Sequence, residues 1–582
     1  MKKTTFMQHE SVLATENGVS ENLKDLTWYD KSVPCRTACP ADTDIPGYLE
    51  AIYQKDFDKA YQINLEDNIF PEILGRVCSR PCEDACRHGD DNNGNSLAIC
   101  FSKRAAGDYK SKNKKYKVKK LSQSTKKSIA IIGAGVAGLA CARELSRFGH
   151  NVHVFEKHKS AGGMLNQGIP IFRLPRNVIK REIDQIIDMG VNITYNQEIS
   201  SYEDLQKLSK KFDAVVLAMG TLKPNKIDKS FTCNEFVEDG LDFLLRINEF
   251  NSKKVGQNVV VIGGGYTSMD CSRTAIRLGA KSVRTFYRRD IGDLEILPGE
   301  LDELKNEDGR MIFSARPNKL ITKKNKLIAL ELIKTKINSK NKLVDIIGSK
   351  FRIKTDHIIL AIGQKQDTSI IADITKFKLK LRNSISNNKL EKNVFVAGDY
   401  ALGATTLIDA IGHAKKTAIK IDKFLMGRDL ITNVVKIQDV KTTSRSLRMN
   451  YIPLHDMSTL NIKMRTLTKE VEIGFNKKNS TSEASRCYLC HYKFEINNTL
   501  CVLCDECLLV KPVKDCIIET EKTLTDIDGD TKYAKINATK TNGIYHGKLY
   551  IDHKKCIRCG ECERVCPTNA ISIQKIEKVS HA

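Results

Sequence analysis

Long apolar runs are missing from this chain. No stretch of its 582 residues approaches the roughly 20 consecutive apolar residues that a membrane-spanning helix needs. The first residues, MKKTTFMQHESVLATENG, contain two lysines but no apolar core of signal-peptide length. These two absences predict a cytoplasmic location and no membrane span.

A nucleic-acid-binding motif is missing as well, although the net charge is +24. The positive residues do not gather on one aromatic-studded motif, and the densest run, residues 110–127, has the composition of a solvated connector. We therefore expect no nucleic-acid partner. A positive surface can instead steer an acidic protein partner into contact.

The 19 cysteines lack the spacing of a disulfide scaffold. Most of them cluster in C-x2-C and C-x3-C elements, which bring thiolates around a metal centre more readily than they bridge distant segments. No Ser-His-Asp or paired-carboxylate arrangement is found beside them. The cysteines therefore indicate iron–sulfur chemistry.

A first nucleotide-binding pattern follows the order strand, glycine turn, helix, strand. Gly133, Gly135 and Gly138 form G-x-G-x-x-G after a short buried strand. The first glycine permits a tight turn, the second lets the backbone approach a pyrophosphate, and the third lets helix and strand pack closely. Glu156 ends the next strand, where a carboxylate can accept hydrogen bonds from ribose hydroxyls. The pattern predicts a dinucleotide site.

The pattern returns 130 residues later. Gly263 and Gly265 repeat the first two glycines, and Ser268 replaces the third. The second strand now ends in two arginines rather than an acid, and the guanidinium groups of Arg288 and Arg289 suit the 2′-phosphate of NADP. Two alternatives stay open: the arginines only face solvent, or the adjacent aspartate makes this a site for NAD.

Three cysteines are interpreted as structural. Cys141 and Cys271 occupy the same position in the two patterns, on the helix that follows each glycine turn. A small apolar slot packed on a sheet is a frequent place for a free cysteine. Cys233 has no cysteine neighbour within reach by sequence.

The FAD-binding half is expected to close after the second pattern. Residues 212–221 and 356–364 are predicted to be buried strands that run into glycine turns. Gly398 and Asp399 close a further strand, where the carboxylate can hold the ribityl chain or the pyrophosphate end of FAD, and residues 408–418 follow as a helix over the flavin. Because the second pattern falls between these segments, we expect the NAD(P) domain to be inserted within the FAD domain.

Residues 28–428 resemble the small subunit of glutamate synthase and its relatives in dihydropyrimidine dehydrogenase and in NADH-dependent ferredoxin:NADP oxidoreductase. The motifs that carry the resemblance are PCRTACP, GRVCSRPCEDAC, GAGVAGLA, AGGMLNQGIPIFRLP, GGGYTSMDCSRTA, YRRD and VAGD. The family implies hydride transfer between NAD(P)H and a flavin. It also implies that FAD lies near Gly162, Gly163, Arg173, Asp399 and Thr406.

Two departures from the family fall in the nicotinamide region. Tyr266 stands where relatives usually have Asn, and residues 297–299 are Leu-Pro-Gly where relatives have Met-Pro-Ala. Both departures bear on the choice between NADP and NAD.

Two cysteine elements precede the first glycine turn, Cys35-x3-Cys39 and Cys78-x3-Cys82-x3-Cys86. The proline before Cys82 predicts a helix that starts there and reaches Cys86 one turn later, so these ligands can serve two different clusters. Relatives hold two clusters in this domain. The C-x2-C pair that they carry just upstream is absent here.

We expect a pair from the C-terminal side to replace it. By the resemblance, one cluster is held by Cys35, Cys86, Cys487 and Cys490. The other is held by Cys39, Cys78, Cys82 and a fourth ligand that relatives supply as Glu or Gln. Lys103 falls near that position and is a poor ligand because it is protonated. Cys100, on the same helix face, is a candidate, with water or no ligand as alternatives.

The last hundred residues contain a bacterial ferredoxin run, in which the fourth cysteine serves the neighbouring cluster. Its cysteines are Cys556, Cys559, Cys562 and Cys566. A partner run consists of Cys501, Cys504 and Cys507, and Cys516 can supply the thiolate that it lacks. One cluster is then held by Cys501, Cys504, Cys507 and Cys566, and the other by Cys516, Cys556, Cys559 and Cys562. Residues 517–550 exceed the minimal ferredoxin length and predict an added hairpin.

The predicted fold class is α/β, with two Rossmann-like dinucleotide-binding domains flanked by iron–sulfur domains. We expect an α-helical iron–sulfur domain (1–110), a first segment of the FAD domain (125–248), an NAD(P)-binding domain (249–359), a second segment of the FAD domain (360–428), a basic connector (429–486) and an α+β ferredoxin-like domain (487–582).

The predicted activity is electron transfer between NAD(P)H and a protein through FAD and four [4Fe-4S] clusters. The added ferredoxin domain makes the chain most similar to the iron–sulfur flavoproteins associated with dissimilatory sulfite reductase in sulfur-oxidising bacteria. The expected partner is thus a sulfite reductase or a ferredoxin, and a homodimer is compatible with the pattern. An NAD(P)H:ferredoxin oxidoreductase, a glutamate synthase small subunit and a non-catalytic electron-wiring subunit remain alternatives.

Overall fold

The computed structural model describes residues 19–20, 23–89, 95–228, 231, 235–297, 299–372, 389–391, 393–429, 432–443, 452–525, 531–535 and 547–581. Cys233, interpreted above as structural, and Pro298 lie outside these residues. No helix in the described portion of the chain is both long and apolar enough to cross a membrane.

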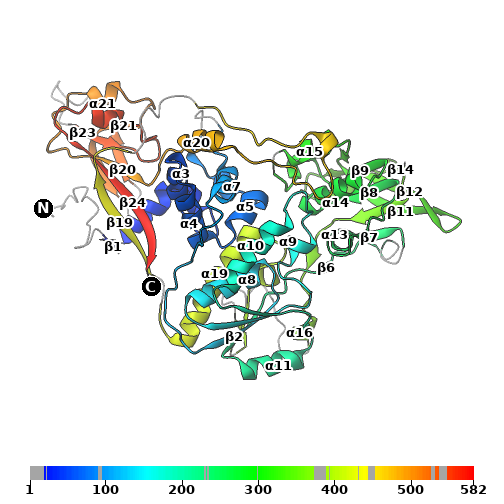
Figure 1. The fold of residues 1–582 in the computed structure, drawn as a ribbon. Coiled ribbons are helices and arrows are strands. Elements are labelled where there is room, and N and C mark those ends of the chain that lie inside the picture. The colour runs from blue at the N-terminus through cyan, green and yellow to red at the C-terminus, as the bar shows by residue number, and fades with distance from the viewer. Residues whose placement is uncertain are drawn as a thin grey trace.

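A six-stranded sheet forms the centre of the molecule (Figure 1). In spatial order its strands are β17 (Lys389–Glu391), β18 (Val394–Val396), β5 (Ala214–Leu217), β2 (Ser128–Ile132), β3 (Asn151–Phe155) and β4 (Asn192–Thr194). All neighbours are parallel except β17 and β18. Along β2 the side chains of Ile129 and Ile131 enter one apolar core, and those of Ala130 and Ile132 enter another. This alternation explains why the strand reads as continuously apolar, since both faces of a parallel sheet are covered.

Helices cover both faces of this sheet. The larger core contains side chains of α8 (Val136–Arg147), α10 (Arg176–Ile187) and α19 (Leu407–Met426), and the smaller one contains side chains of α11 (Tyr202–Lys211). The helix predicted for residues 408–418 is thus present and extends to Met426.

A second sheet, of five parallel strands, lies between β5 and β18 in the chain. Its spatial order is β10 (Arg310–Ile312), β9 (Ser282–Phe286), β8 (Asn258–Ile262), β15 (His357–Leu360) and β7 (Val237–Asp239). The helices α13 (Gly240–Asn248) and α14 (Tyr266–Arg277) pack on it. The predicted insertion of one dinucleotide fold within the other is therefore confirmed. The strand β7 and the helix α13 lie before residue 249, so the second sheet begins earlier than the expected boundary.

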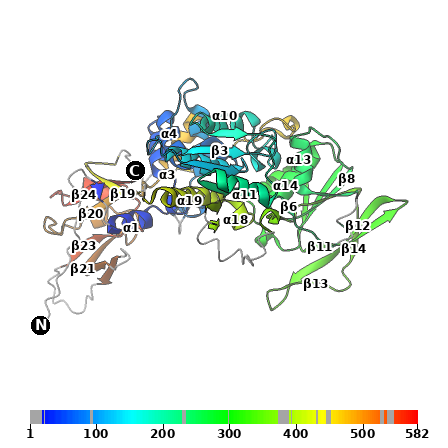
Figure 2. The same cartoon turned by 90° about the horizontal axis from the view of Figure 1, so that it is seen from below.

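Four antiparallel strands extend this domain outward (Figure 2). They are β11 (Ala315–Lys323), β12 (Lys326–Ile337), β13 (Leu343–Asp345) and β14 (Phe351–Lys354). The two crossings between the dinucleotide domains pair with each other as a short ribbon of β6 (Lys223–Pro224) and β16 (Gln364–Lys365).

The N-terminal domain is helical, as predicted. Its helices are α1 (Leu23–Ser32), α2 (Pro34–Thr37), α3 (Ile45–Tyr53), α4 (Phe57–Asn68), α5 (Pro71–Val77), α6 (Pro81–Asp84) and α7 (Ile99–Tyr109). A helix does start at Pro81, but it ends at Asp84 and a 3-10 turn follows from Arg87 to Gly89. Cys86 therefore lies past the helix end and not one turn inside the helix.

The C-terminal domain contains two antiparallel sheets. One joins β1 (Val19–Ser20), β19 (Thr432–Val440), β24 (Ile571–His581) and β20 (Tyr492–Ile496), and the other joins β22 (Thr531–Lys535), β21 (Ile517–Thr525) and β23 (Lys548–Ile551). The predicted added hairpin is present as β21 and β22. Because β19 pairs with β24 along nine residues, the beginning of the expected connector belongs to this domain.

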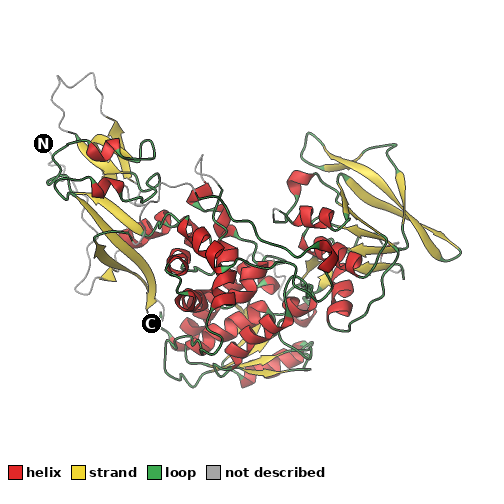
Figure 3. Cartoon of the chain, turned by 45° about the horizontal axis from the view of Figure 1, so that its top comes forward, coloured by secondary structure: helices red, strands yellow, loops and turns green. Residues whose placement is uncertain are grey.

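The C-terminal domain is docked on the N-terminal helices. Tyr29 and Val33 pack against Val435, Ile437 and Ile576 in one apolar cluster. The helix α20 (Lys477–Ser485) packs on α3 and α7. In Figure 3 most of the helices lie in the middle of the molecule, and the outer domains with their strands lie on either side.

The connector also reaches the inserted domain. Arg465 pairs with Glu303 and Glu307 beside α15 (Glu300–Asn306), and Glu470 pairs with Arg76 and Arg104 of the helical domain. Figure 1 shows this segment running from α20 toward α15. The connector thus holds three domains together.

Candidate functional site

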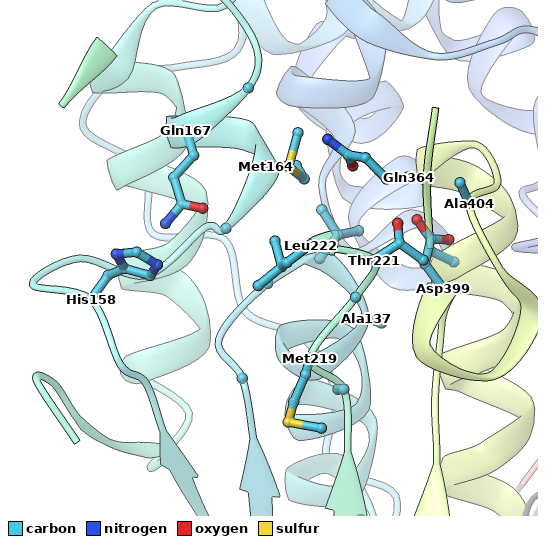
Figure 4. A pocket seen from close by; sticks show the side chains of 18 of the residues that line it. Ala137, His158, Met164, Gln167, Met219, Thr221, Leu222, Gln364, Asp399 and Ala404 are labelled. Carbon is cyan, nitrogen blue, oxygen red and sulfur yellow. The ribbon is translucent and has the colours of Figure 1, made fainter. Parts of the chain in front are cut away.

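One cavity of about 450 Å³ is lined by both dinucleotide domains. The first glycine turn contributes Gly133 and Gly135, and the helix α14 of the inserted domain contributes Tyr266 and Asp270. Figure 4 shows Met164, Thr221 and Asp399 among the side chains around it. A molecule bound in this cavity contacts both domains.

The first glycine turn provides backbone space for a phosphate. A Cβ added at Gly138 would lie 1.9 Å from the carbonyl oxygen of Gly133, so helix and strand approach as closely as the motif requires. A Cβ at Gly135 would meet nothing within 4 Å. Gly135 is the N-cap of the 12-residue helix α8, and no side chain caps this end. Gly135, Val136 and Ala137 of this first turn line the cavity, and uncapped N–H groups at a helix N-terminus suit a pyrophosphate.

The carboxylate of Glu156 lines the same cavity and is 5% exposed. It accepts hydrogen bonds from the backbone N–H groups of Ala134 (2.7 Å) and His158 (2.9 Å). These bonds orient the carboxylate toward the turn and leave further lone pairs for ribose hydroxyls. Gly162 and Gly163 both have positive φ, and Gly163 packs against the backbone of Gly135.

The segment that leads into α19 also lines the cavity, with Asp399, Thr405 and Thr406. The carboxylate of Asp399 accepts a hydrogen bond from the hydroxyl of Thr405 (2.5 Å), and burial raises the pKa of Asp399 to about 6. Thr406 caps α19 together with Asp409 and also lines the cavity. The backbone N–H of Gly398 donates to Nδ1 of His413 (3.0 Å). The first turn and the Gly-Asp segment therefore meet at one cavity.

Arg173 lines the cavity and bridges the two domains. Its guanidinium donates to Asp270 (2.8 Å) and to Glu300 (2.5 Å), both in the inserted domain. Burial alone lowers the pKa of Arg173, but the two carboxylates raise it overall. The sequence did not single out either carboxylate, because their pairing with residue 173 depends on how the two domains meet.

Replacing Arg173 with Gln is expected to destabilise this junction. Asp270 is 5% exposed, and removing its cation leaves an unpaired buried charge, which costs about 3–5 kcal/mol. Chemical denaturation of the holoprotein measures the loss. Because the double variant Arg173→Gln/Asp270→Asn removes the stranded charge, it should recover some of the stability; a double variant no more stable than the single one contradicts the pairing.

The second glycine turn differs from the first at its third position, where a serine replaces the glycine. A Cβ added at Gly263 would lie 2.1 Å from the carbonyl oxygen of Ala361, whereas a Cβ added at Gly265 would meet nothing within 4 Å. Ser268 is fully buried, and its hydroxyl donates to the carbonyl of Gly265 (2.6 Å). The serine that replaces the third glycine is thus tied to the turn and does not line the cavity.

Arg288 and Arg289 lie just after β9, separated from it by Tyr287, and are exposed. Neither side chain forms an ion pair with a described residue. Both guanidinium groups are available to a ligand at the carboxyl end of the sheet. Cys141 and Cys271 are fully buried in the cores of the two dinucleotide domains.

Cysteines from the two ends of the chain surround one small cavity of about 20 Å³. They are Cys35, Cys86, Cys487 and Cys490. Burial first, and then the neighbouring thiols of Cys86, Cys490 and Cys487, raise the pKa of Cys35. The structure thus brings residues separated by about 450 positions to one place.

Cys39, Cys78 and Cys82 gather around a buried lysine. Burial lowers the pKa of Lys103, but thiols that include those of Cys78, Cys82 and Cys39 raise it overall. Cys100 lies nearby with its thiol donating to the carbonyl of Leu74 (3.1 Å), and burial raises its pKa to about 12. The structure therefore places both Lys103 and Cys100 beside this set.

Two further sets lie in the C-terminal domain. A cavity of about 20 Å³ is lined by Cys501, Cys504, Cys507 and Cys566. Beside it, burial and then the thiols of Cys556 and Cys559 raise the pKa of Cys516 to about 12, and burial and the same two thiols raise the pKa of Cys562. Among the cysteines of the described residues, Cys504 alone is exposed.

The backbone beside several cysteines points N–H groups at sulfur. Two positions after the first cysteine of four elements, the chain adopts a left-handed conformation, at Arg80, Leu489, Leu503 and Arg558. Three of these residues donate their N–H groups to Sγ of Cys78, Cys487 and Cys556 over 3.4–3.5 Å. Such bonds stabilise the thiolate form, which iron requires.

These sets fit a cluster better than a single ion. Within the described ranges, no three His, Cys, Asp or Glu side chains come close enough to hold one metal ion. A [4Fe-4S] cluster keeps its four thiolates apart because its own iron and sulfide fill the space between them. The donor sets and the N–H···S bonds fit such clusters.

The fold and cavities define a dinucleotide-dependent iron–sulfur flavoprotein. Residues 127–418 match the family "Pyridine nucleotide-disulphide oxidoreductase". Residues 3–115 match "Dihydropyrimidine dehydrogenase domain II, 4Fe-4S cluster", and residues 549–572 match "4Fe-4S binding domain". The chain belongs to the pyridine nucleotide-disulphide oxidoreductase family, in its branch with iron–sulfur domains. The predictions of an oxidoreductase with FAD, a nicotinamide dinucleotide and 4Fe-4S clusters are confirmed.

Several relatives share most of this architecture. The chain is 31% identical over 535 residues to the "NADPH-Fe(3+) oxidoreductase subunit beta" of Geobacter sulfurreducens, covering 83% of this chain and 79% of that protein. It is 29% identical to the "NADP(+)-dependent formate dehydrogenase subunit beta" of Moorella thermoacetica, covering 79% and 71%. It is 30% identical to the "Glutamate synthase [NADPH] small chain" of Azospirillum brasilense, covering 66% and 84%.

Proposed function

We propose that this protein oxidises NADPH at FAD and delivers the electrons, through four [4Fe-4S] clusters, to a protein partner. The observation that carries the proposal is the cavity that both dinucleotide domains line, together with cysteine sets that extend to the surface at Cys504. FAD accepts a hydride as two electrons, whereas each cluster carries one. The chain's own work is therefore to position the cofactors and to tune their potentials.

In this proposal the first glycine turn and Asp399 hold FAD. The N-terminus of α8 receives the pyrophosphate, and Glu156 accepts hydrogen bonds from the ribose hydroxyls. Asp399 and Thr406 hold the ribityl side. Tyr266 faces the cavity from α14, so the nicotinamide enters past this side chain.

We assign the four ligand sets as the sequence predicted them. The inner pair of sites uses Cys35, Cys86, Cys487 and Cys490, and Cys39, Cys78 and Cys82 with a fourth ligand. The outer pair uses Cys516, Cys556, Cys559 and Cys562, and Cys501, Cys504, Cys507 and Cys566. Cys100 remains the candidate for the fourth ligand, and its hydrogen bond to Leu74 has to be released for it to bind iron.

The choice of NADPH over NADH depends on the two exposed arginines. The variant Arg288→Ala/Arg289→Ala is expected to raise the KM for NADPH roughly tenfold or more, because it removes charge-assisted hydrogen bonds to the 2′-phosphate. The KM for NADH should change less than about twofold. Steady-state kinetics with both nucleotides measure this difference. Equal changes in the KM for NADPH and for NADH would mean that the two arginines face solvent and do not contact the 2′-phosphate.

The partner is proposed to approach the Cys501 site. Cys504 is exposed, and Val502 (62% exposed) and Leu509 (77%) present apolar surface beside it. A sulfite reductase is the partner that the added ferredoxin domain suggests, and a ferredoxin is the alternative. Two of the relatives are themselves named as beta subunits, which supports a stable complex. Purification with the native partner distinguishes these outcomes.

Anaerobic titration with NADPH and NADH tests the enzyme itself. Bleaching of the flavin absorbance by either nucleotide supports the proposal. If neither nucleotide bleaches the flavin of the holoprotein, the chain is an electron-wiring subunit and the proposed activity fails.

A further inference from the structure

A buried arginine lies between two of the cysteine sets. Arg558 is 1% exposed and belongs to the Cys556-x2-Cys559 element. Its guanidinium donates to the carbonyls of Cys556 (2.6 Å), Tyr492 (3.2 Å) and Cys490 (3.4 Å). Arg558 therefore touches the backbone of one cysteine from each set.

A second arginine approaches the same gap from the helical domain. The guanidinium of Arg87 donates to Sγ of Cys490 (3.7 Å) and to the carbonyls of Cys556 (3.4 Å) and Lys554. Two cations thus share the space between the Cys487–Cys490 loop and the Cys556 loop. Two positive charges this close repel each other, and nearby negative charge is needed to offset the repulsion.

Neither cation has a carboxylate partner among the described residues. The contrast with other buried arginines is clear: Arg143 pairs with Glu144, and Arg486 pairs with Glu483 at 2.6 Å. Neutral carbonyls satisfy the hydrogen bonds of Arg558 but do not balance its charge. A buried charge without a counter-charge is strongly unfavourable, so this site needs negative charge that no described carboxylate supplies.

The two cysteine sets can supply it. Four thiolates around a [4Fe-4S] cluster give the assembly a net negative charge, and reduction adds one more. A guanidinium between two such assemblies stabilises the reduced state of each, because that state is the more negative one.

We propose that Arg558, supported by Arg87, links two clusters electrostatically and raises the reduction potentials of both. One is the cluster held by Cys35, Cys86, Cys487 and Cys490, and the other is the cluster held by Cys516, Cys556, Cys559 and Cys562. This inference rests on the proposed function, since it requires clusters at these two sites. It assigns a positioning and charge-setting role to a residue that no ligand motif singles out.

The test is a redox titration of the full-length holoprotein, followed by electron paramagnetic resonance. In Arg558→Gln, which keeps a hydrogen-bond donor but removes the charge, the ratio of reduced to oxidised cluster at the two sites should fall at least tenfold at a fixed solution potential. That fall corresponds to about 59 mV for a one-electron couple. The variants Cys487→Ser and Cys559→Ser, each of which removes a ligand of one cluster, assign the resonance signals to the two sites. The reduction potentials of the flavin and of the Cys501 site should shift much less in Arg558→Gln.

Two comparison variants separate charge from structure. Arg558→Lys keeps the charge with fewer hydrogen bonds, so it should return the ratio to within about threefold of the parent. Arg564→Gln removes the same charge from the same domain, but its side chain is 66% exposed and water screens it, so no such shift is expected.

The outcomes are distinct. Full iron content in Arg558→Gln with unchanged potentials overturns the inference, and so does an equal shift at every centre. If Arg558→Gln does not assemble, the half-buried Arg87→Gln takes its place, and an unchanged potential in that variant overturns the inference equally. Absence of iron from both sites in the parent protein would instead count against the proposed function.

Discussion

The variant Cys487→Ser is expected to lose one cluster and, with it, electron delivery to the partner. Cys487 lies beside Cys35 and Cys86 although about 400 residues separate it from Cys86. Serine is a poor iron ligand, so iron content should fall by about a quarter if four equal clusters are present. Reduction of the flavin by NADPH should continue, while reduction of the outer clusters should slow at least roughly 100-fold because the inner relay is gone.

Iron analysis and stopped-flow spectroscopy measure these two effects. Cys271→Ser is the matched control, since Cys271 is buried in the inserted domain and its thiol donates to the carbonyl of Gly240 (3.5 Å), a bond that serine can keep. The control should retain its iron and its rates. Full iron content and normal delivery in Cys487→Ser would remove this cysteine from the ligand set.

The variant Gly138→Ala is expected to lose most of its FAD. The added Cβ would lie 1.9 Å from the carbonyl oxygen of Gly133, so α8 has to move away from the turn that receives the pyrophosphate. Overpacking of this kind costs about 1–3 kcal/mol, and displacement of the turn adds the lost phosphate contacts. Together these effects should weaken FAD binding at least roughly 100-fold, which the ratio of flavin to protein after gel filtration reports.

The corresponding position of the second turn provides the comparison. Ser268→Ala removes a hydroxyl that donates to Gly265 but adds no atom, so it should leave FAD content unchanged and alter NADPH binding only modestly. A Gly138→Ala protein that purifies with full FAD would mean that this turn does not hold the pyrophosphate.

Local spacing was enough to predict the fold class. The burial of β2 on both faces, the two glycine turns and the insertion of one sheet within the other all follow from short-range patterns, because strand and helix periods and turn requirements are local properties. The helix at Pro81 shows the limit. Proline marks where a helix starts, but the end at Asp84 depends on the turn that follows.

Domain edges depended on tertiary pairing. The strand β19 carries an ordinary mixed sequence and joins the C-terminal sheet only because β24 lies beside it. In the same way β7 joins the inserted domain by pairing with β15, more than 100 residues away. Composition does not reveal such partners, since strand propensity reflects the surface on which a segment packs.

The sequence by itself determined which residues can carry the chemistry: glycines at turn spacing, cysteines in short repeats and an acid after the first dinucleotide unit. Only the tertiary structure decided which of them meet. The partners of Arg173 arise where domains touch, and so does the gap around Arg558, in which no described carboxylate pairs with it. The charge balance of a buried group depends on every neighbour within a few ångströms rather than on its place in the chain.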